Sequence, residues 1–306
     1  ADAVNRCSHG PLRDFRLTEE DRHELKIAGL LHDCGKITTP VHVVDKATKL
    51  EKIFDRIELI QTRAEIVLRD FQIAVSKNLI TEEMAMKRHQ QLIDDFNFLS
   101  HCNIGVESMH DSDIARVHTI AKDYQWEDIS GRVHSFLSDD EIQNLTIRAG
   151  TLTAQERHII NHHIDTTIAM LEKLPWPKHL KNVPEYAGGH HERMDGKGYP
   201  KGLTREQMSV QARCMGIADI FEALTAQDRP YKKGKTLSES LHILGNMKLN
   251  GHIDPDLFDI FMWEKVYEEY AEKFLDQHLV DHLDLDKVPG YVPPPAGYRS
   301  QTIDSA

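Results

Sequence analysis

Apolar residues recur three and four positions apart over most of the chain, a spacing that predicts α-helices. A first helix is expected to begin at Thr18, because this threonine and the three acidic residues after it form a capping sequence. Its last residue on the inward face is a histidine, at the end of an otherwise apolar stripe. That face carries Leu25, Ala28, Leu31 and His32.

Residues 51–101 follow a heptad-like pattern, with apolar positions in alternating steps of four and three. A polar break at 76–78 separates two halves, and Thr81 can cap the second. We expect an antiparallel helical hairpin that packs on itself and on its own globule; the alternative is an arm for dimerisation or for receiving a signal. Its apolar positions are Ile53, Ile57, Ile60, Ala64, Val67, Phe71 and Ala74, then Ala85, His89, Leu92, Phe96 and Leu99.

Another helix is expected to open at 151–156, with Ile160, His163 and Thr167 on one face. A histidine on an apolar face is more often a core residue than a ligand, so His163 alone does not indicate a site.

Two more helices are expected near the end of the chain. The first covers 213–226 and carries Asp219 on an apolar face, where a carboxylate needs a partner. The second is a closing amphipathic helix over 257–275. The proline-rich segment 288–306 is expected to be an irregular tail.

The composition is that of an ordinary globular protein. The chain has 306 residues, 40% of them hydrophobic, which is enough for one large domain or two. No apolar run approaches the roughly 18 residues that cross a bilayer, so we expect no membrane contact from this chain. The net charge of −12 disfavours a nucleic-acid polymer as partner, and a phosphate ligand would need local cations or metal ions.

The four cysteines lie far apart and form no Cys-x-x-Cys pair, which argues against a disulfide framework and against a thiolate zinc site. Without a signal segment we expect a cytoplasmic location. Because the numbering begins at Ala1, we also expect a piece of a longer protein, and a membrane-anchored signalling protein is one such context.

The stretch 188–200 is the first candidate for chemistry. His190 and His191 stand directly before a glycine-rich loop that ends at Pro200. Two neighbouring imidazoles cannot both face one apolar core, but they can converge on a metal ion if the backbone turns there. Taken alone, the pair fits an ordinary polar loop equally well.

Residues elsewhere favour the metal interpretation. His32 and Asp33 are adjacent at the end of a buried face, where an unpaired carboxylate would be costly. The inward residues together offer nitrogen and oxygen ligands and no thiolate, which suits iron, manganese or a related divalent ion. Such a set predicts one binuclear site that activates water for phosphoester hydrolysis. The six candidate ligands are His32, Asp33, His163, His190, His191 and Asp219.

These motifs resemble those of the HD-GYP family, and the resemblance covers most of 18–275. It implies an all-α, HD-domain-like helical bundle that forms a single catalytic domain over 1–306, with the hairpin 51–101 inserted. It also implies a bacterial phosphodiesterase, the output domain of a signalling protein, that hydrolyses cyclic di-GMP to pGpG and then to GMP. The matching stretches are His32-Asp33-Cys34-Gly35-Lys36, 152–163, 190–200, Ala218-Asp219 and Arg229-Pro230-Tyr231-Lys232.

The resemblance implies two divalent metal ions as cofactors, iron or manganese, with Asp33 as the bridging ligand. His32 and Asp219 would bind one ion. The other would be bound by His163, His190 and His191.

It also implies roles toward a cyclic dinucleotide substrate. Lys36 would contact the scissile phosphate or assist the leaving group, so that Asp33 and Lys36 are the expected catalytic residues. Arg229 and Lys232 would hold phosphate oxygens.

The chain departs from the family at one metal ligand. The family brings a further histidine from upstream of the His-Asp helix, and nothing before Thr18 matches it, since His9 sits in a Gly-Pro turn. The shell of the first metal is therefore expected to be incomplete. Hydrolysis of 3′,3′-cyclic GMP-AMP and a catalytically weak binding or interaction module stay open as alternatives, as does a homodimer through the hairpin.

Overall fold

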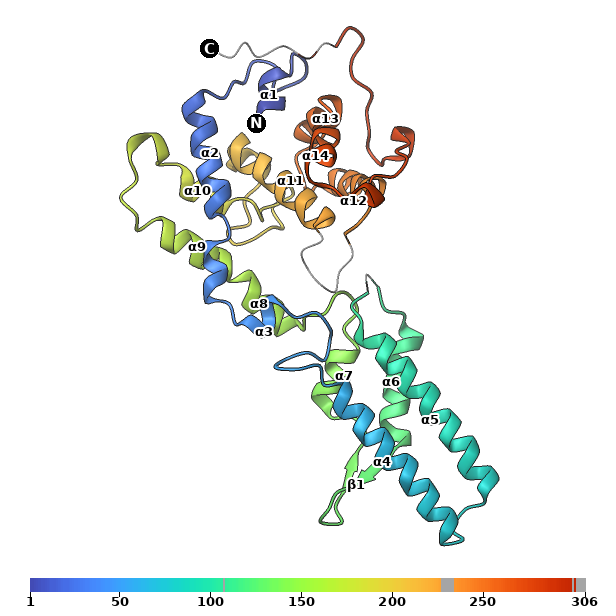
Figure 1. Cartoon of the computed structure of the whole chain (residues 1–306). Helices are drawn as coiled ribbons and strands as arrows, with labels where there is room; N and C mark the ends of the chain where they lie inside the picture. Colours follow the sequence, from blue (N-terminus) through green and yellow to red (C-terminus); the bar gives the residue numbers. More distant parts are fainter. Residues whose placement is uncertain (107, 227–233, 299, 301–306) are drawn as a thin grey trace. The chain divides into compact units, whose positions relative to one another are not determined.

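The computed structural model describes the whole chain except residues 107, 227–233, 299 and 301–306. Its regular structure is helical apart from one two-stranded antiparallel sheet in the described part, so the predicted all-α class is confirmed (Figure 1). The chain divides into two compact units, residues 1–38 with 161–306 and residues 39–160. None of the described helices is long and apolar enough to cross a bilayer.

The first unit contains the helices that carry the candidate ligands. As predicted, Thr18 caps α2: its hydroxyl accepts a hydrogen bond from the amide of Asp21, whose carboxylate accepts one from the amide of Thr18. The elements of this unit are α1 (Asp2–Arg6), α2 (Glu19–Leu31), η1 (Cys34–Thr38), α9 (His163–Leu171), η2 (Lys178–Leu180), α10 (Val183–Gly188), η3 (Arg205–Gln207), α11 (Val210–Thr225), α12 (Leu237–Leu249), α13 (Pro255–Trp263), α14 (Val266–Phe274), η4 (Gln277–Leu279) and η5 (Leu285–Lys287).

Two apolar clusters hold the first unit together. One lies between α2, α9, α10 and α11 and includes Ala28, Leu171 and Val183. The other joins α11 to α12, α13 and α14, with Phe221 and Phe258 buried in it. Burying a side chain of this size stabilises the fold by about 1.5–3 kcal/mol. These contacts fix the ends of α2, α9, α10 and α11 relative to one another.

Two expected helices are each divided. The helix predicted over 257–275 is α13 and α14, because Lys265 adopts a left-handed conformation with φ of 53° and ends α13. The helix predicted to open at 151–156 is α8 (Ala154–Asn161) and α9. His162, between them, keeps right-handed helical angles (φ −66°, ψ −12°).

The described part of the tail after η5 contains no helix or strand, but it packs on the first unit. Val288 is buried, and the indole Nε1 of Trp263 donates to the carbonyl of Val292 at 2.8 Å. The Tyr298 hydroxyl donates to the carboxylate of Glu264. The tail therefore contributes more to the core than its composition indicates.

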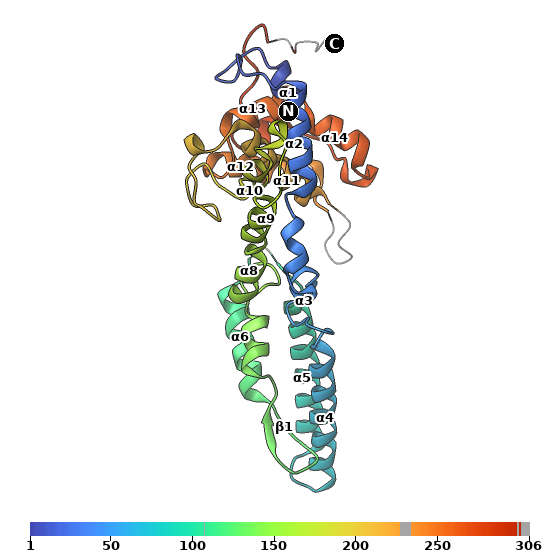
Figure 2. The ribbon, with the colours of Figure 1, turned by 90° about the vertical axis from the view of Figure 1, so that its left-hand side faces the viewer.

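The second unit is built on the pair α4 (Ile57–Ser76) and α5 (Glu82–Asn103), which lie along each other in both views (Figures 1 and 2). Ile60, Ala64 and Val67 are buried in its apolar cluster, as their spacing predicts. Ile53 was expected beside them and is instead 97% exposed, because α4 begins only at Ile57. The unit also contains α3 (Val41–Val44), α6 (Asp111–Asp123), β1 (Gln125–Glu127), β2 (Val133–Ser135), α7 (Asp139–Leu145) and most of α8.

Candidate metal centre

The six predicted ligands meet within the first unit. Each comes from the end of a helix or from a turn, except Asp219, which lies inside α11. His32 caps the C-terminus of α2 and Asp33 follows it directly. His163 is the first residue of α9, and the His190-His191 pair follows Gly189 at the end of α10.

The side chains form two groups that share Asp33. One group is His32, Asp33 and Asp219; the other is Asp33, His163, His190 and His191. Within each group the candidate ligand atoms lie within 4.8 Å of one another, close enough for a single ion to contact them all.

Asp33 offers a different oxygen to each group. Its Oδ1 lies 3.2 Å from Nε2 of His163, and its Oδ2 lies 3.3 Å from Nε2 of His32. On the other side of His32, the same Nε2 is 3.4 Å from Oδ1 of Asp219. A carboxylate placed in this way can bridge two ions.

Two of the histidines are oriented by backbone carbonyls. Nδ1 of His190 is 2.6 Å from the carbonyl of Ala187, and Nδ1 of His32 is 2.7 Å from the carbonyl of Gly29. Since a carbonyl only accepts, Nδ1 carries the proton and the lone pair of a neutral ring lies on Nε2. Nε2 of His190 is buried without a hydrogen-bond partner among the described residues. A metal ion would satisfy it, so these residues fit a metal ion.

The two carboxylates are held in the charged form. Burial alone would raise the pKa of Asp33, but hydrogen bonds from His163 and His32 hold this pKa well below its ordinary range. Burial likewise opposes the ionised form of Asp219, and the bond from His32 is the main cause that lowers its pKa. The centre therefore concentrates negative charge where a cation would bind.

The histidines differ in protonation according to their neighbours. Hydrogen bonds to Asp219 and Asp33 raise the pKa of His32 to about 10, so a proton here offsets the two carboxylates. Burial lowers the pKa of His190, and burial is also the largest cause that lowers the pKa of His191 to about 3. Neutral His190 and His191 are in the form that binds metal ions.

Of the three predicted cationic residues, the structure describes only Lys36. Nζ of Lys36 lies 2.5 Å from Oδ2 of Asp33, at the edge of the centre, and its side chain is 36% exposed. A lysine in this position can donate to an anionic substrate. Arg229 and Lys232 lie outside the described residues.

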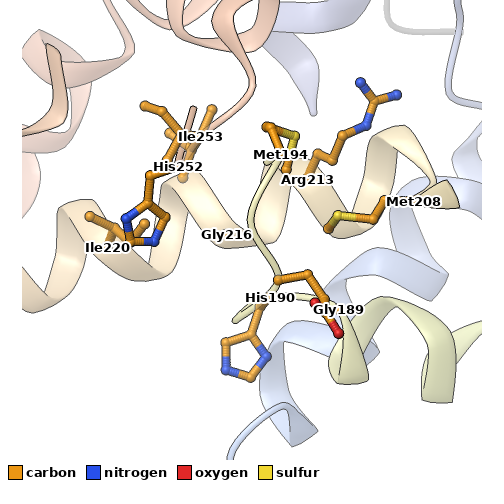
Figure 3. Close-up of a pocket in the computed structure, with 11 residues that line it drawn as sticks. Gly189, His190, Met194, Met208, Arg213, Gly216, Ile220, His252 and Ile253 are labelled. Carbon is orange, nitrogen blue, oxygen red and sulfur yellow. The ribbon is translucent and has the colours of Figure 1, made fainter. Parts of the chain in front are cut away.

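A small cavity lies beside the histidine pair. Figure 3 shows Gly189 and His190 next to α11 at Gly216, with His252 on another segment of the lining. Its volume of about 10 Å³ has room for about one water molecule. A cyclic dinucleotide is far larger, so this cavity is not its binding site.

Sequence reasoning missed the groups that orient the ligands. The carbonyls of Gly29 and Ala187 each lie three residues before the histidine that they orient. Because every residue has a carbonyl, no residue type could have indicated them. The hydroxyl of Thr167 accepts a bond of 2.9 Å from the amide of Gly35 and holds η1 against α9. Thr167 was predicted on the inward face, but not this contact.

Comparisons with known proteins agree with the motifs. Two family models, both described as HD domain, match residues 138–257 and 7–100. A cyclic di-GMP phosphodiesterase of Pseudomonas aeruginosa is 37% identical over 115 residues, which are 38% of this chain and 27% of that protein. A 3′3′-cGAMP-specific phosphodiesterase of Vibrio cholerae is 42% identical over 80 residues, 26% of this chain and 18% of that protein.

A solved cyclic GMP-AMP-specific phosphodiesterase of V. cholerae aligns with 85% of this chain and 57% of its own, at 12% identity and a TM-score of 0.29. The matches to the two curated relatives span about a quarter or less of those proteins. The matching HD-domain models and relatives, together with the His32-Asp33 and His190-to-Pro200 motifs, support the resemblance of this chain to the HD-GYP family.

Proposed function

We propose that this chain is a metal-dependent phosphodiesterase domain that hydrolyses cyclic di-GMP to pGpG and then to GMP. The observation that carries the proposal is the position of Asp33, which belongs to both ligand groups and contacts Lys36. A shared carboxylate is typical of two-metal sites that act on phosphoesters. The names of several relatives support this substrate class.

The proposed cofactors are two divalent ions, iron or manganese. His32, Asp33 and Asp219 would hold one, and Asp33, His163, His190 and His191 the other. When bound, such ions lower the pKa of water and offset the charge of the scissile phosphate.

The protein side chains supply position and protons. The Ala187 carbonyl fixes the ring of His190, and the two low-pKa carboxylates keep the negative charge that retains cations. Lys36 carries a proton 2.5 Å from Asp33 at the accessible edge. As the water oxygen bonds to phosphorus and the bond from phosphorus to O3′ breaks, Lys36 would donate to the leaving O3′ or to a phosphate oxygen. Lys36, with Arg229 and Lys232, is proposed to bind the phosphates.

A second candidate substrate is 3′,3′-cyclic GMP-AMP, because one similar protein is named as specific for it. The proposed setting is cytoplasmic signalling, which agrees with four free cysteines. A homodimer through α4 and α5 is also part of the proposal.

The test is turnover of cyclic di-GMP, 3′,3′-cyclic GMP-AMP and cyclic di-AMP by the purified chain with Mn²⁺ or Fe²⁺, followed by chromatography of the products. Fastest conversion of cyclic di-GMP to pGpG and GMP supports the proposal. Preference for the mixed dinucleotide favours the second candidate. Binding without turnover indicates the weak binding module, and neither binding nor turnover contradicts all three.

A further inference from the structure

The loop that follows the histidine pair folds back onto His191. The amide of Tyr199 donates to the carbonyl of His191 at 3.2 Å. The Tyr199 ring stacks on the His191 ring, with 4.8 Å between centroids and 25° between planes. The rings of His190 and His163 also lie close to this imidazole, at centroid distances of 4.0 and 5.2 Å. The orientation of His191 therefore depends on where the loop places Tyr199.

A buried carboxylate closes this loop. Glu192 is only 4% exposed, and its two oxygens accept hydrogen bonds from the amides of Lys201 at 2.7 Å and Leu203 at 2.8 Å. Bonds between an ionised carboxylate and amides are stronger than neutral ones. Although Glu192 follows His191 directly, it belongs to neither ligand group. Its carboxylate binds backbone amides of the returning chain.

The loop crosses itself too closely for a side chain at one point. A Cβ atom on Gly198 would lie 2.5 Å from Cα of Glu192 and would also collide with the amide nitrogen of Arg193. Position 198 therefore requires glycine, because the loop backbone passes close to the backbone of Glu192 there. In the sequence, Tyr199 therefore stands between the close contact at Gly198 and the amides of Lys201 and Leu203 that bind Glu192.

We propose that Glu192 is a positioning residue for His191. Its carboxylate fixes the return of the chain at 201–203, and this keeps Tyr199 on the imidazole, whose nitrogen then points to the group of Asp33, His163 and His190. The inference rests on the proposed function only through the metal centre, and it concerns binding of the ion rather than the identity of the substrate.

The experiment compares Glu192→Gln with the parent chain by two measurements. Amide hydrogen exchange reports the bonds at Lys201 and Leu203, and calorimetric titration with Mn²⁺ alone reports both ions. We expect loss of protection at these amides and weakening of one Mn²⁺ site by tenfold or more, the usual effect of losing an outer-shell partner, with the other site unchanged. Glu206→Gln is the matched control, because Glu206 is exposed on the same segment.

Tyr199→Leu separates the stack from the loop closure. This variant keeps the Glu192 bonds, so protection at Lys201 and Leu203 should stay while the same Mn²⁺ site weakens. Unchanged Mn²⁺ binding in both variants would overturn the proposal, as would unchanged amide protection in Glu192→Gln. A parent chain that binds two Mn²⁺ ions and hydrolyses no cyclic dinucleotide would remove the proposed function and leave the positioning role intact.

Discussion

Oδ1 of Asp33 lies 3.2 Å from Nε2 of His163, although the two residues stand on either side of the whole second unit in the sequence. The contact depends on how closely η1 docks on α9. Gly35 donates to Thr167 at this junction, and the Asp33 and Lys36 side chains extend from the same turn. The geometry of the centre is therefore set by backbone packing as well as by the ligands.

Gly35→Ala should disturb this docking. The added Cβ would lie 2.6 Å from the amide nitrogen of Thr167 and would collide with the carbonyl of His163, both of which are backbone atoms. We expect a loss of about 1–3 kcal/mol in the free energy of unfolding, as for other overpacked sites, together with weaker Mn²⁺ binding. Urea unfolding and Mn²⁺ titration measure the two effects.

The control for this prediction is Gly29→Ala. Gly29 lies within α2 and a Cβ there meets nothing within 4 Å. Alanine is better than glycine inside a helix by about 1 kcal/mol, so this variant should be equal to the parent or more stable. If both variants behaved alike, close docking of η1 would not explain the effect.

Lys36→Met should separate catalysis from metal binding. Lys36 contacts Asp33 but belongs to neither ligand group, so removing its charge should leave both ions in place. Loss of a proton donor or of a charge at the phosphate should lower kcat by about 10²-fold or more. Metal analysis and steady-state kinetics on the same preparation check this. Loss of metal in parallel with activity would assign Lys36 to the structure of the centre.

Asp254 should make a large contribution to stability. Its buried carboxylate accepts bonds from Arg205, Arg213 and the amides at the start of α13. Burial opposes its charge, but the bonds from Arg205 and the helix start lower its pKa in the folded chain. Asp254→Asn should cost about 3–5 kcal/mol at pH 7, because Arg213 loses its carboxylate partner and Arg205 keeps only Asp256.

The pH dependence of this effect follows from the lowered pKa. A carboxyl with a lowered folded pKa stabilises the fold above its unfolded pKa of about 4, and this stability is lost as the pH falls through the folded value. The difference in unfolding free energy between parent and Asp254→Asn should therefore shrink in acid. Asp14→Asn, at an exposed pair, should show a small difference at all pH values. A difference for Asp254 that grows in acid would contradict the assignment.

The proposed homodimer must use surface that α4 and α5 leave open. Ile73, Leu79, Met84 and Met86 are exposed around the turn of the hairpin. We expect sedimentation to give a dimer for the parent chain and a monomer for the double variant Ile73→Glu and Met86→Glu, since charge cannot be buried there cheaply. Equal monomeric masses for both chains would count against association through the hairpin.

Local features of the fold could be predicted from the sequence. The spacing of Ala28 and Leu31 and the cap at Thr18 depend on residues one or two turns apart, which the sequence displays directly. For the same reason the inward positions of His163 and Asp219 could be inferred. The break between α13 and α14 at Lys265 could not be predicted, because a lysine gives no indication that its backbone will adopt a left-handed conformation.

The bounds of the second unit could not be predicted from the sequence either. It spans residues 39–160, well beyond the predicted hairpin, because contacts between distant segments define it. The amide of Lys49, for example, donates to the carbonyl of Asn103, and the amide of Leu50 donates to the side chain of the same residue. Such pairs leave no periodic pattern. The ring of Tyr199 on His191 was missed for the same reason.

The shared position of Asp33 is tested most directly by the number of metal ions bound per chain. Asp33→Asn removes the charge that serves both groups and keeps the side-chain shape, whereas His163→Ala removes a ligand from one group only. After equilibration with Mn²⁺ and removal of free metal, the account predicts two ions per parent chain, close to none for Asp33→Asn and one for His163→Ala. Two ions retained by Asp33→Asn would contradict it, and Asp33 would then be a structural partner of His32 and His163.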